Sequence, residues 1–156
     1  MKVAKQKSRD LARLAALVRQ MKVAMLTTIE PDGSLRSRPL HTVELDAAGR
    51  LWFFTQAHAP KSAGIEANRH QVNLSYADPR DEDFASISGT AHLVRDKEKM
   101  RALWISLLEP WFPQGLDDPD LALLEVRIDK AEYWDTPHHE NVKIATLPAQ
   151  NQGQRT

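Results

Sequence analysis

The segment RSRPLHTVELDAAGRLWFFTQAHAPK, residues 36–61, contains two extended runs separated by a turn, which is typical of neighbouring antiparallel strands. Arg36 and Arg38 are two residues apart in the first run, so they share one face of the predicted strand. The second run, LWFFTQ, carries an aromatic pair, and Lys61 follows shortly after its end. The segment therefore predicts cations and aromatic rings gathered at neighbouring strand ends.

Other extended runs flank this segment on both sides. Residues 23–29 are rich in β-formers and lead through PDGS, a favourable turn sequence, into residues 35–45. Gly89 lies in a later alternating run and predicts a bulge or a barrel bend there. The runs downstream of the opening segment cover residues 71–77, 84–94 and 121–135.

Two helices are predicted outside these strands. Ser8 can cap the first helix, whose apolar residues share one face. Asp96 starts the second, and Pro110 ends its apolar stripe of Met100, Leu103, Trp104, Leu107 and Leu108. A shorter helical candidate is KSAGIEANR, residues 61–69. Short turns between strands, with helices at the start and after the fifth strand, favour a mainly β fold: a closed or split β-barrel of about six mostly antiparallel strands.

Composition limits the classes of partner. The chain has 156 residues and no cysteine, so we expect one domain over residues 1–148, followed by a disordered tail at 149–156. Lysine and arginine together number 21, as do aspartate and glutamate, which argues against nucleic-acid binding by a broad basic surface. The apolar residues of the N-terminus are interrupted by Arg13, and no later run reaches the roughly 20 residues of a membrane span. We therefore expect a cytoplasmic protein without membrane contact.

Phosphate-binding glycine motifs are absent, so side chains would have to hold any phosphate. Arg36 and Arg38 lie on one strand, and Lys61 sits where a helix is predicted to start, a position that favours anions. Phe53 and Phe54 lie in the strand predicted to pair with the arginine strand. An aromatic ligand with a phosphate tail, such as flavin mononucleotide (FMN), would match both kinds of group. The alternative is that the arginines are solvated and at least one phenylalanine is plain core.

Several motifs then occur in a fixed order: RSRPL, GRLWFFT, PKSAGIEANRHQVNLSYADP, ASISGTAHLVRD, WFPQGLDDPDLALLEV and AEYWD. This order resembles the general stress protein 26 branch of the pyridoxamine 5′-phosphate oxidase-like superfamily, over about residues 10–136. The resemblance implies a split β-barrel of the FMN-binding type. It also implies that the flavin, FMN or else FAD, lies at the interface of a homodimer.

The resemblance implies flavin contacts on two strands and at the start of the following segment. Lys61 matches the family's phosphate-gripping lysine, and Ser62 is a plausible second donor. Pro60 stands where pyridoxamine phosphate oxidases carry an arginine, and their C-terminal arginine and histidine motif is missing, so vitamin B6 oxidation is not expected. The strand positions that match flavin contacts are Arg38, Pro39, Leu40, Phe54 and Thr55.

The loop at residues 111–120 combines two large rings, Trp111 and Phe112, with three carboxylates. The functional interpretation of this loop is a lid over the flavin. The structural alternative is a helix-to-strand connection whose rings cover the barrel. Large apolar side chains follow one another closely between residues 104 and 112, more than one short helix can bury, which favours a homodimer interface.

Two functions are compatible with this pattern. The first is a flavin-dependent oxidoreductase in which the cofactor performs the redox chemistry, and the second is a non-catalytic flavin-binding or flavin-buffering stress protein. A deazaflavin or haem-related binder is a third, weaker alternative. No side chain is assigned a catalytic role. HHE at residues 138–140 is expected to be surface rather than a metal site, because adjacent histidines point in different directions.

Overall fold

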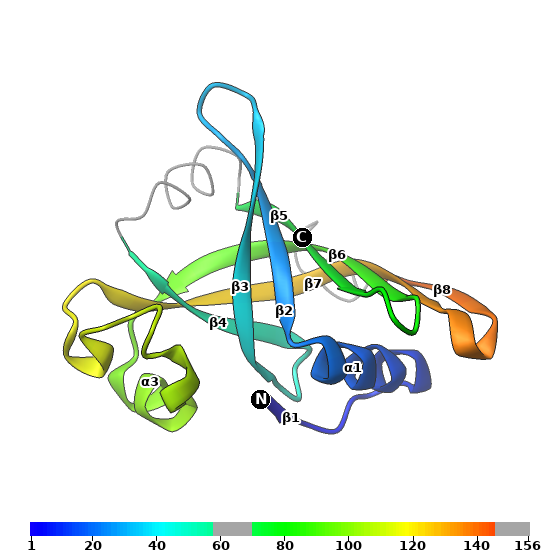
Figure 1. The fold of residues 1–156 in the computed structure, drawn as a ribbon, viewed down its shortest axis with the longest axis horizontal. Helices are drawn as coiled ribbons and strands as arrows, with labels where there is room; N and C mark the ends of the chain where they lie inside the picture. The colour runs from blue at the N-terminus through cyan, green and yellow to red at the C-terminus, as the bar shows by residue number, and fades with distance from the viewer. Residues whose placement is uncertain (58–69, 146–156) are drawn as a thin grey trace, which may run out of the picture.

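A computed structural model describes residues 1–57 and 70–145 of the chain, which form strands, two α-helices and short 3-10 helices (Figure 1). The strands are β1 (Lys2–Val3), β2 (Val23–Ile29), β3 (Leu35–Leu45), β4 (Arg50–Gln56), β5 (Gln71–Asp78), β6 (Asp83–Val94), β7 (Leu121–Asp135) and β8 (Glu140–Ala145). The helices are α1 (Arg9–Met21) and α3 (Lys97–Leu103), with 3-10 turns at Ser106–Leu108, Gly115–Asp117 and Thr136–His138.

Six strands close into a barrel. The hydrogen-bonded order is β3-β2-β5-β6-β7-β4, and an additional β3–β4 pairing joins the two ends. All six pairings are antiparallel. β8 extends the sheet beside β7, and β1 adds a short parallel pairing to β3. The mainly β split-barrel fold predicted from the sequence is therefore confirmed.

Helix α1 forms as its sequence predicts. The Ser8 side chain accepts a hydrogen bond from the backbone N–H of Leu11, which caps the helix. Leu14, Leu17 and Val18 are fully buried where α1 packs against β5, β6 and β8. The helix thus covers one end of the barrel, as Figure 1 shows. No helix within the described ranges combines the length and apolar character that crossing a membrane requires.

The apolar interior divides into two clusters because neighbouring residues of β4 face opposite ways. Phe53 is fully buried in the larger cluster, which fills the barrel beneath α1. Phe54 is 2% exposed and belongs to the smaller cluster, between the barrel and α3. Both rings are thus core, and only Phe54 faces the side on which α3 packs.

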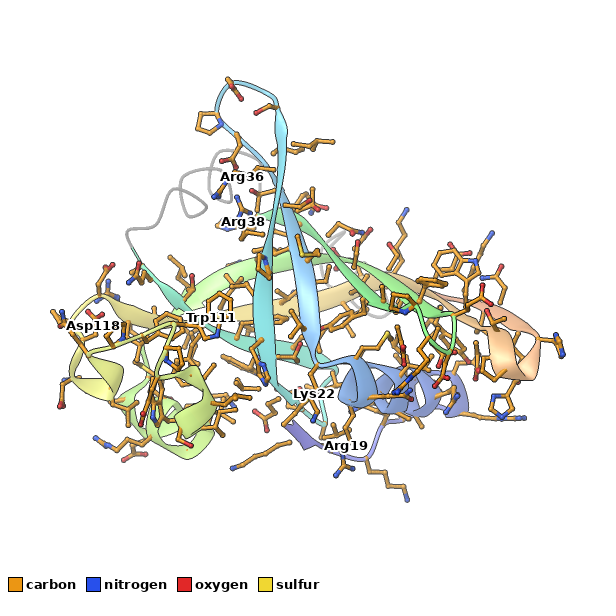
Figure 2. All side chains as sticks on the ribbon, in the orientation of Figure 1. Arg19, Lys22, Arg36, Arg38, Trp111 and Asp118 are labelled. Atoms are coloured by element: carbon orange, nitrogen blue, oxygen red, sulfur yellow. The ribbon has the colours of Figure 1, made fainter. Side chains whose placement is uncertain are left out.

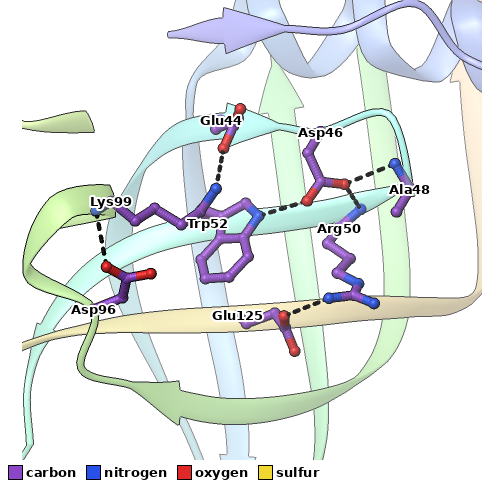
Figure 3. Close-up of polar contacts among 8 residues, drawn as sticks. All are labelled: Glu44, Asp46, Ala48, Arg50, Trp52, Asp96, Lys99 and Glu125. Carbon is purple, nitrogen blue, oxygen red and sulfur yellow. Dashed lines mark hydrogen bonds and ion pairs between the residues drawn. The ribbon is translucent and has the colours of Figure 1, made fainter. Parts of the chain in front are cut away.

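The β3–β4 turn is held by side chains that also fasten α3 to the barrel (Figure 3). Asp46 accepts hydrogen bonds from the indole Nε1 of Trp52 and from the backbone N–H of Arg50, each at 2.9 Å. Lys99 of α3 pairs with Glu44 at 2.9 Å and lies 4.3 Å from the centre of the Trp52 ring. The resulting cation–π contact and ion pair explain why α3 sits over this face of the sheet.

Gly89 lies at an irregularity, as predicted. The pairing of β6 with β7 shifts register between Ser88 and Gly89. A Cβ at position 89 would lie 2.5 Å from the backbone oxygen of Arg127 and 2.7 Å from a methyl group of Val126. Glycine therefore allows the backbones of β6 and β7 to approach closely at this bend.

The predicted second helix is shorter than its apolar stripe. α3 ends at Leu103, Trp104 adopts an extended conformation, and Leu107 is 62% exposed instead of lying in a stripe. The Trp104 ring, which follows the end of the helix, packs edge-on against Phe54 with ring centroids 5.3 Å apart. The prediction that the helix runs to Pro110 is therefore wrong.

Two short strands, β1 and β8, were not predicted. In β8, Val142 and Ile144 pack against the main core, an alternation too brief to stand out in the sequence. The helical candidate at 61–69 and the tail at 149–156 lie outside the described residues. The single domain over residues 1–148 stays a prediction.

Candidate functional site

Arg38 is a buried cation on β3. Its side chain is 9% exposed, and its partner across the β2–β3 pair is the fully buried Leu26. Nη1 donates to the hydroxyl of Thr28 at 2.7 Å, and Nη2 lies 3.6 Å from a carboxylate oxygen of Glu30. Within the described residues, Nε and Nη2 are buried and lack a hydrogen-bond acceptor. The guanidinium therefore retains two donors that an anion could engage.

Burial is the main influence on the electrostatics of this arginine. It lowers the pKa of Arg38, the positive charge of Arg36 lowers it further, and Glu30 opposes both effects. An arginine nevertheless keeps its charge at neutral pH. A buried, incompletely paired positive charge favours the binding of an anion beside it.

Arg36 shares the face of Arg38 but not its environment. Figure 2 shows both side chains on the same side of the β2–β3 hairpin. Arg36 pairs with Thr28 nearer the hairpin turn and is exposed, whereas Arg38 is buried. The predicted difference between the two arginines, with Arg38 as the ligand candidate, agrees with their burial.

An apolar hollow of about 60 Å³ is lined on β3 by residues that directly follow Arg38 in sequence. Pro39 and Leu40, two of the predicted flavin contacts, line it, and Phe54 contributes from β4. Trp111 and Phe112 line it from the loop that follows α3. Five predicted contacts from three separate segments therefore come together around one hollow.

The rings around the hollow differ in burial. Phe54, Trp104 and Phe112 form an edge-to-face cluster with centroids 5.3 to 6.5 Å apart. Trp111 is 63% exposed, and Figure 2 shows its side chain between the loop and β3. Phe112 is thus anchored by its neighbours, while Trp111 offers a free ring surface beside the hollow.

Thr55 is the remaining predicted contact on β4. It is 1% exposed, and its hydroxyl has no hydrogen-bond partner in the part of the chain that is described. An unpaired buried hydroxyl is unfavourable unless a ligand or water completes it. Lys61 and Ser62, the predicted phosphate contacts, lie outside the described residues, so their roles stay predictions.

Five residues of this region were not predicted as site residues: Thr28, Glu30, Val23, His41 and Leu108, the last of which lines the hollow from the 3-10 turn after α3. Thr28 and Glu30 contact Arg38 from β2 and the turn after it, a relationship that depends on the pairing register of the hairpin. Val23 and His41 face each other across β2 and β3 and both line the hollow. His41 lies two residues from the predicted contact Pro39 on the same face of β3, and this spacing is the signal that could have identified it. Val23 follows only from its pairing with His41.

His41 is a titratable group that lines the hollow. Burial lowers its pKa, and the positive charges of the N-terminus and Lys22 lower it further. The imidazole is therefore predominantly neutral at pH 7, which suits an apolar surface.

Comparisons with known proteins agree with this architecture. The model of the family described as pyridoxamine 5′-phosphate oxidase like matches residues 9–155. The protein bli-3 of Neurospora crassa is 28% identical over 130 residues, which cover 77% of this chain and 62% of that protein. The chain thus spans less than two thirds of the length of this curated relative.

Solved structures share the fold, including the following two. A protein related to general stress protein 26, from Clostridium acetobutylicum, superposes with a TM-score of 0.73 at 21% identity, covering 87% of this chain and 94% of that one. A pyridoxamine 5′-phosphate oxidase-related, FMN-binding protein from Nostoc punctiforme gives a TM-score of 0.64 at 14% identity, covering 91% and 99%. The resemblance inferred from the ordered motifs is confirmed: this chain belongs to the pyridoxamine 5′-phosphate oxidase-like family.

Proposed function

We propose that this protein binds FMN at the hollow beside Arg38 and acts as a flavin-dependent oxidoreductase, as a homodimer in the cytoplasm. The observation that carries the proposal is the buried guanidinium of Arg38, whose Nε and Nη2 lack acceptors among the described residues. Pro39 and Leu40, which directly follow Arg38 on β3, line the hollow together with Phe54 and form an apolar surface that would suit a flat aromatic ring. The FMN-binding relative from Nostoc punctiforme supports the same ligand class.

The residues present fit the two chemical parts of FMN. Arg38 would donate to the phosphate, together with Lys61 and Ser62, as the family resemblance implies. The hydroxyl of Thr55, buried and without a partner in the described ranges, would hydrogen-bond the ligand. When bound, the isoalloxazine ring would supply the redox chemistry, while the protein would supply binding, orientation and exclusion of water. FAD would present the same ring and phosphate to these groups.

The homodimer is proposed because one chain encloses too little of the site. A hollow of about 60 Å³ is much smaller than the roughly 300–1,000 Å³ of typical ligand pockets. Val23 and Trp111, which line it, are 45% and 63% exposed, and Met25, opposite Pro39, is 41% exposed. A second copy covering these side chains would both deepen the hollow and bury apolar surface.

The ligand assignment is tested by titrating FMN and riboflavin into the Arg38→Ala variant. Riboflavin has no phosphate, so loss of a charge-assisted hydrogen bond should weaken FMN about tenfold to a hundredfold and riboflavin much less. Arg36→Ala is the matched control, because it removes an exposed cation from the same strand face. Lys61→Ala should behave like Arg38→Ala. Equal losses for FMN and riboflavin would contradict the phosphate assignment.

The oxidoreductase proposal has its own test. The flavin-loaded protein should oxidise NADH or NADPH faster than free FMN at the same concentration. Bound flavin without such turnover would instead support the non-catalytic flavin-binding alternative. An absorption spectrum of the purified protein, with flavin bands near their usual wavelengths, would separate both from a deazaflavin or haem-related ligand.

A further inference from the structure

Three aspartates lie in one row across neighbouring strands, at the end of the barrel opposite the loop that carries Trp111. Asp78 at the end of β5 pairs with Asp83 at the start of β6, and Asp83 pairs in turn with Asp135 at the end of β7. Residues that face each other directly across antiparallel strands share one side of the sheet. The row runs beside α1, which contacts both β5 and β6 (Figure 1).

Helix α1 supplies a partner to each outer aspartate of this row. Arg13 donates from Nε to Asp135 at 2.6 Å, and this contact lowers the pKa of that carboxyl. Gln20 donates from its amide nitrogen to Asp78 at 3.1 Å. The middle carboxylate, Asp83, is 3% exposed, and its Oδ1 is buried without a hydrogen-bond partner in the described structure.

An unpaired carboxylate at this degree of burial needs compensation. Buried charges in proteins are paired, hydrogen-bonded or bound to a metal ion. Burial and the neighbouring Asp135 raise the pKa of Asp83, Arg13 opposes them, and Asp81 and Asp78 add to the increase. The side chain is thus suited to hold either a proton or a cation. A cation is favoured if further carboxylate oxygens lie close enough to bind it as well.

Asp81, in the turn between β5 and β6, completes a set of three. One carboxylate oxygen from each of Asp78, Asp81 and Asp83 lies within 4.8 Å of the others, so all three can contact a common ion. Oxygen ligands are those that calcium prefers, and calcium tolerates irregular arrangements better than magnesium does. We propose that Asp78, Asp81 and Asp83 bind a calcium ion, which pairs the buried carboxylate of Asp83 and joins the β5–β6 turn to the end of the barrel.

The proposal is tested on the full chain by calorimetric titration with Ca²⁺, with Mg²⁺ in parallel, and by thermal unfolding. Calcium at about a hundred times its dissociation constant should raise the Tm by about 5 to 10 °C, because it binds the folded state only. Magnesium should bind more weakly. The measurements do not involve flavin, so their outcome is independent of the proposed function.

Three variants make the assignment specific. Asp83→Asn should abolish the calcium response and raise the Tm of the calcium-free protein, since an amide is buried at less cost than an unpaired charge. Asp81→Asn should weaken calcium at least tenfold; this exposed residue can be changed without disturbing the core. Asp117→Asn removes an exposed carboxylate from a remote 3-10 turn and should leave the response intact.

Two results would overturn the proposal. Absence of both a binding heat and a Tm shift in the unmodified protein would leave a proton as the partner of Asp83. Equal calcium shifts in the unmodified protein, Asp81→Asn and Asp83→Asn would show that calcium binds elsewhere on the surface.

Discussion

Arg38 and Glu30 approach to 3.6 Å between Nη2 and Oε2, yet they form no hydrogen bond. Glu30 instead accepts a hydrogen bond from the hydroxyl of Thr28 at 2.8 Å, and that hydroxyl in turn accepts from Nη1 of Arg38. The carboxylate therefore offsets the arginine's charge without occupying its free donors. A phosphate bound to these donors would therefore be repelled by the nearby carboxylate of Glu30.

We expect Glu30→Gln to strengthen FMN binding. The substitution removes a negative charge close to the proposed phosphate position and retains an oxygen that can accept from Thr28. Relief of this repulsion is worth ~1–2 kcal/mol, so affinity for FMN should rise roughly fivefold to thirtyfold, with little change for riboflavin. Asp32→Asn, in the exposed turn of the same hairpin, is the charge-matched control. Weaker FMN binding in Glu30→Gln would mean that Glu30 chiefly positions Arg38.

Substitution of Trp111 should affect the bound flavin, whereas substitution of Phe112 should also affect the stability of the fold. Trp111→Ala removes a 63% exposed ring, so the free energy of unfolding should change by less than about 0.5 kcal/mol while bound flavin becomes more accessible to an iodide quencher. Phe112→Ala removes a ring packed against Phe54 and Trp104 and should lower stability by about 1–3 kcal/mol. Urea unfolding and flavin fluorescence measure the two effects. Unchanged quenching in Trp111→Ala would exclude that ring from the flavin site.

Gly89→Ala should destabilise the barrel. The added methyl group would lie 2.5 Å from the Arg127 backbone oxygen, and a backbone atom cannot move aside as the end of a flexible side chain can. Overpacking of this kind costs about 1–3 kcal/mol or more, measurable by urea unfolding. Ser88→Ala, one residue away, is the control and should have a much smaller effect. Similar stabilities for the two variants would show that β6 and β7 can separate at the bend.

The hydroxyls of Thr42 and Tyr76 should prove energetically coupled. They lie 2.8 Å apart across the interior of the barrel, and both residues are at most 2% exposed. Either Thr42→Val or Tyr76→Phe leaves the other hydroxyl buried without its partner, at a cost of about 1–3 kcal/mol. In the double variant, the second loss should be smaller by about 1 kcal/mol in a double-mutant cycle measured by urea unfolding. Strictly additive losses would mean that another group satisfies each hydroxyl.

Two histidines should make stability depend on pH. Burial lowers the pKa of His92, its stacked neighbour His70 lowers it further, and burial also lowers the pKa of His41. The unfolded chain therefore binds more protons than the folded protein just below pH 6.5, so stability should be complete above about pH 6.5 and fall as the pH decreases from there. His92→Gln should flatten this decline in urea midpoints measured between about pH 5 and 8. The same slope in the variant would assign the decline to other groups.

Pattern alone predicted those elements whose signals are local. The bounds of β2, β3 and β7 agree with the predicted runs, Ser8 caps α1, and the bend occurs at Gly89. Each depends on residues close in sequence, such as alternation, turn chemistry or a capping side chain. The early end of α3 was missed because the position of Trp104 depends on a contact with Phe54, about fifty residues away.

The candidate site residues stay predictions, and the balance of charge around Arg38 was not among them. The resemblance gave Arg38 as a candidate ligand, while the contacts that Thr28 and Glu30 make with it follow from pairing register and cannot be seen in composition. No metal site was predicted from the sequence. Asp83 acquires its significance from its burial and from an oxygen that lacks a hydrogen-bond partner among the described residues, neither of which the sequence displays.

The position of β7 between β6 and β4 determines when the barrel can be completed during synthesis. β4 leaves the ribosome early, but its pairing with β7 must wait until residues 121–135 have emerged. Until then β4 and β6 each present an open edge, and the side chains of Leu51 and Phe53 lack part of their cover. A nascent chain stalled before residue 121 would thus expose unpaired strand edges that are prone to aggregate. Chaperones that recognise such edges would bind mainly in that interval.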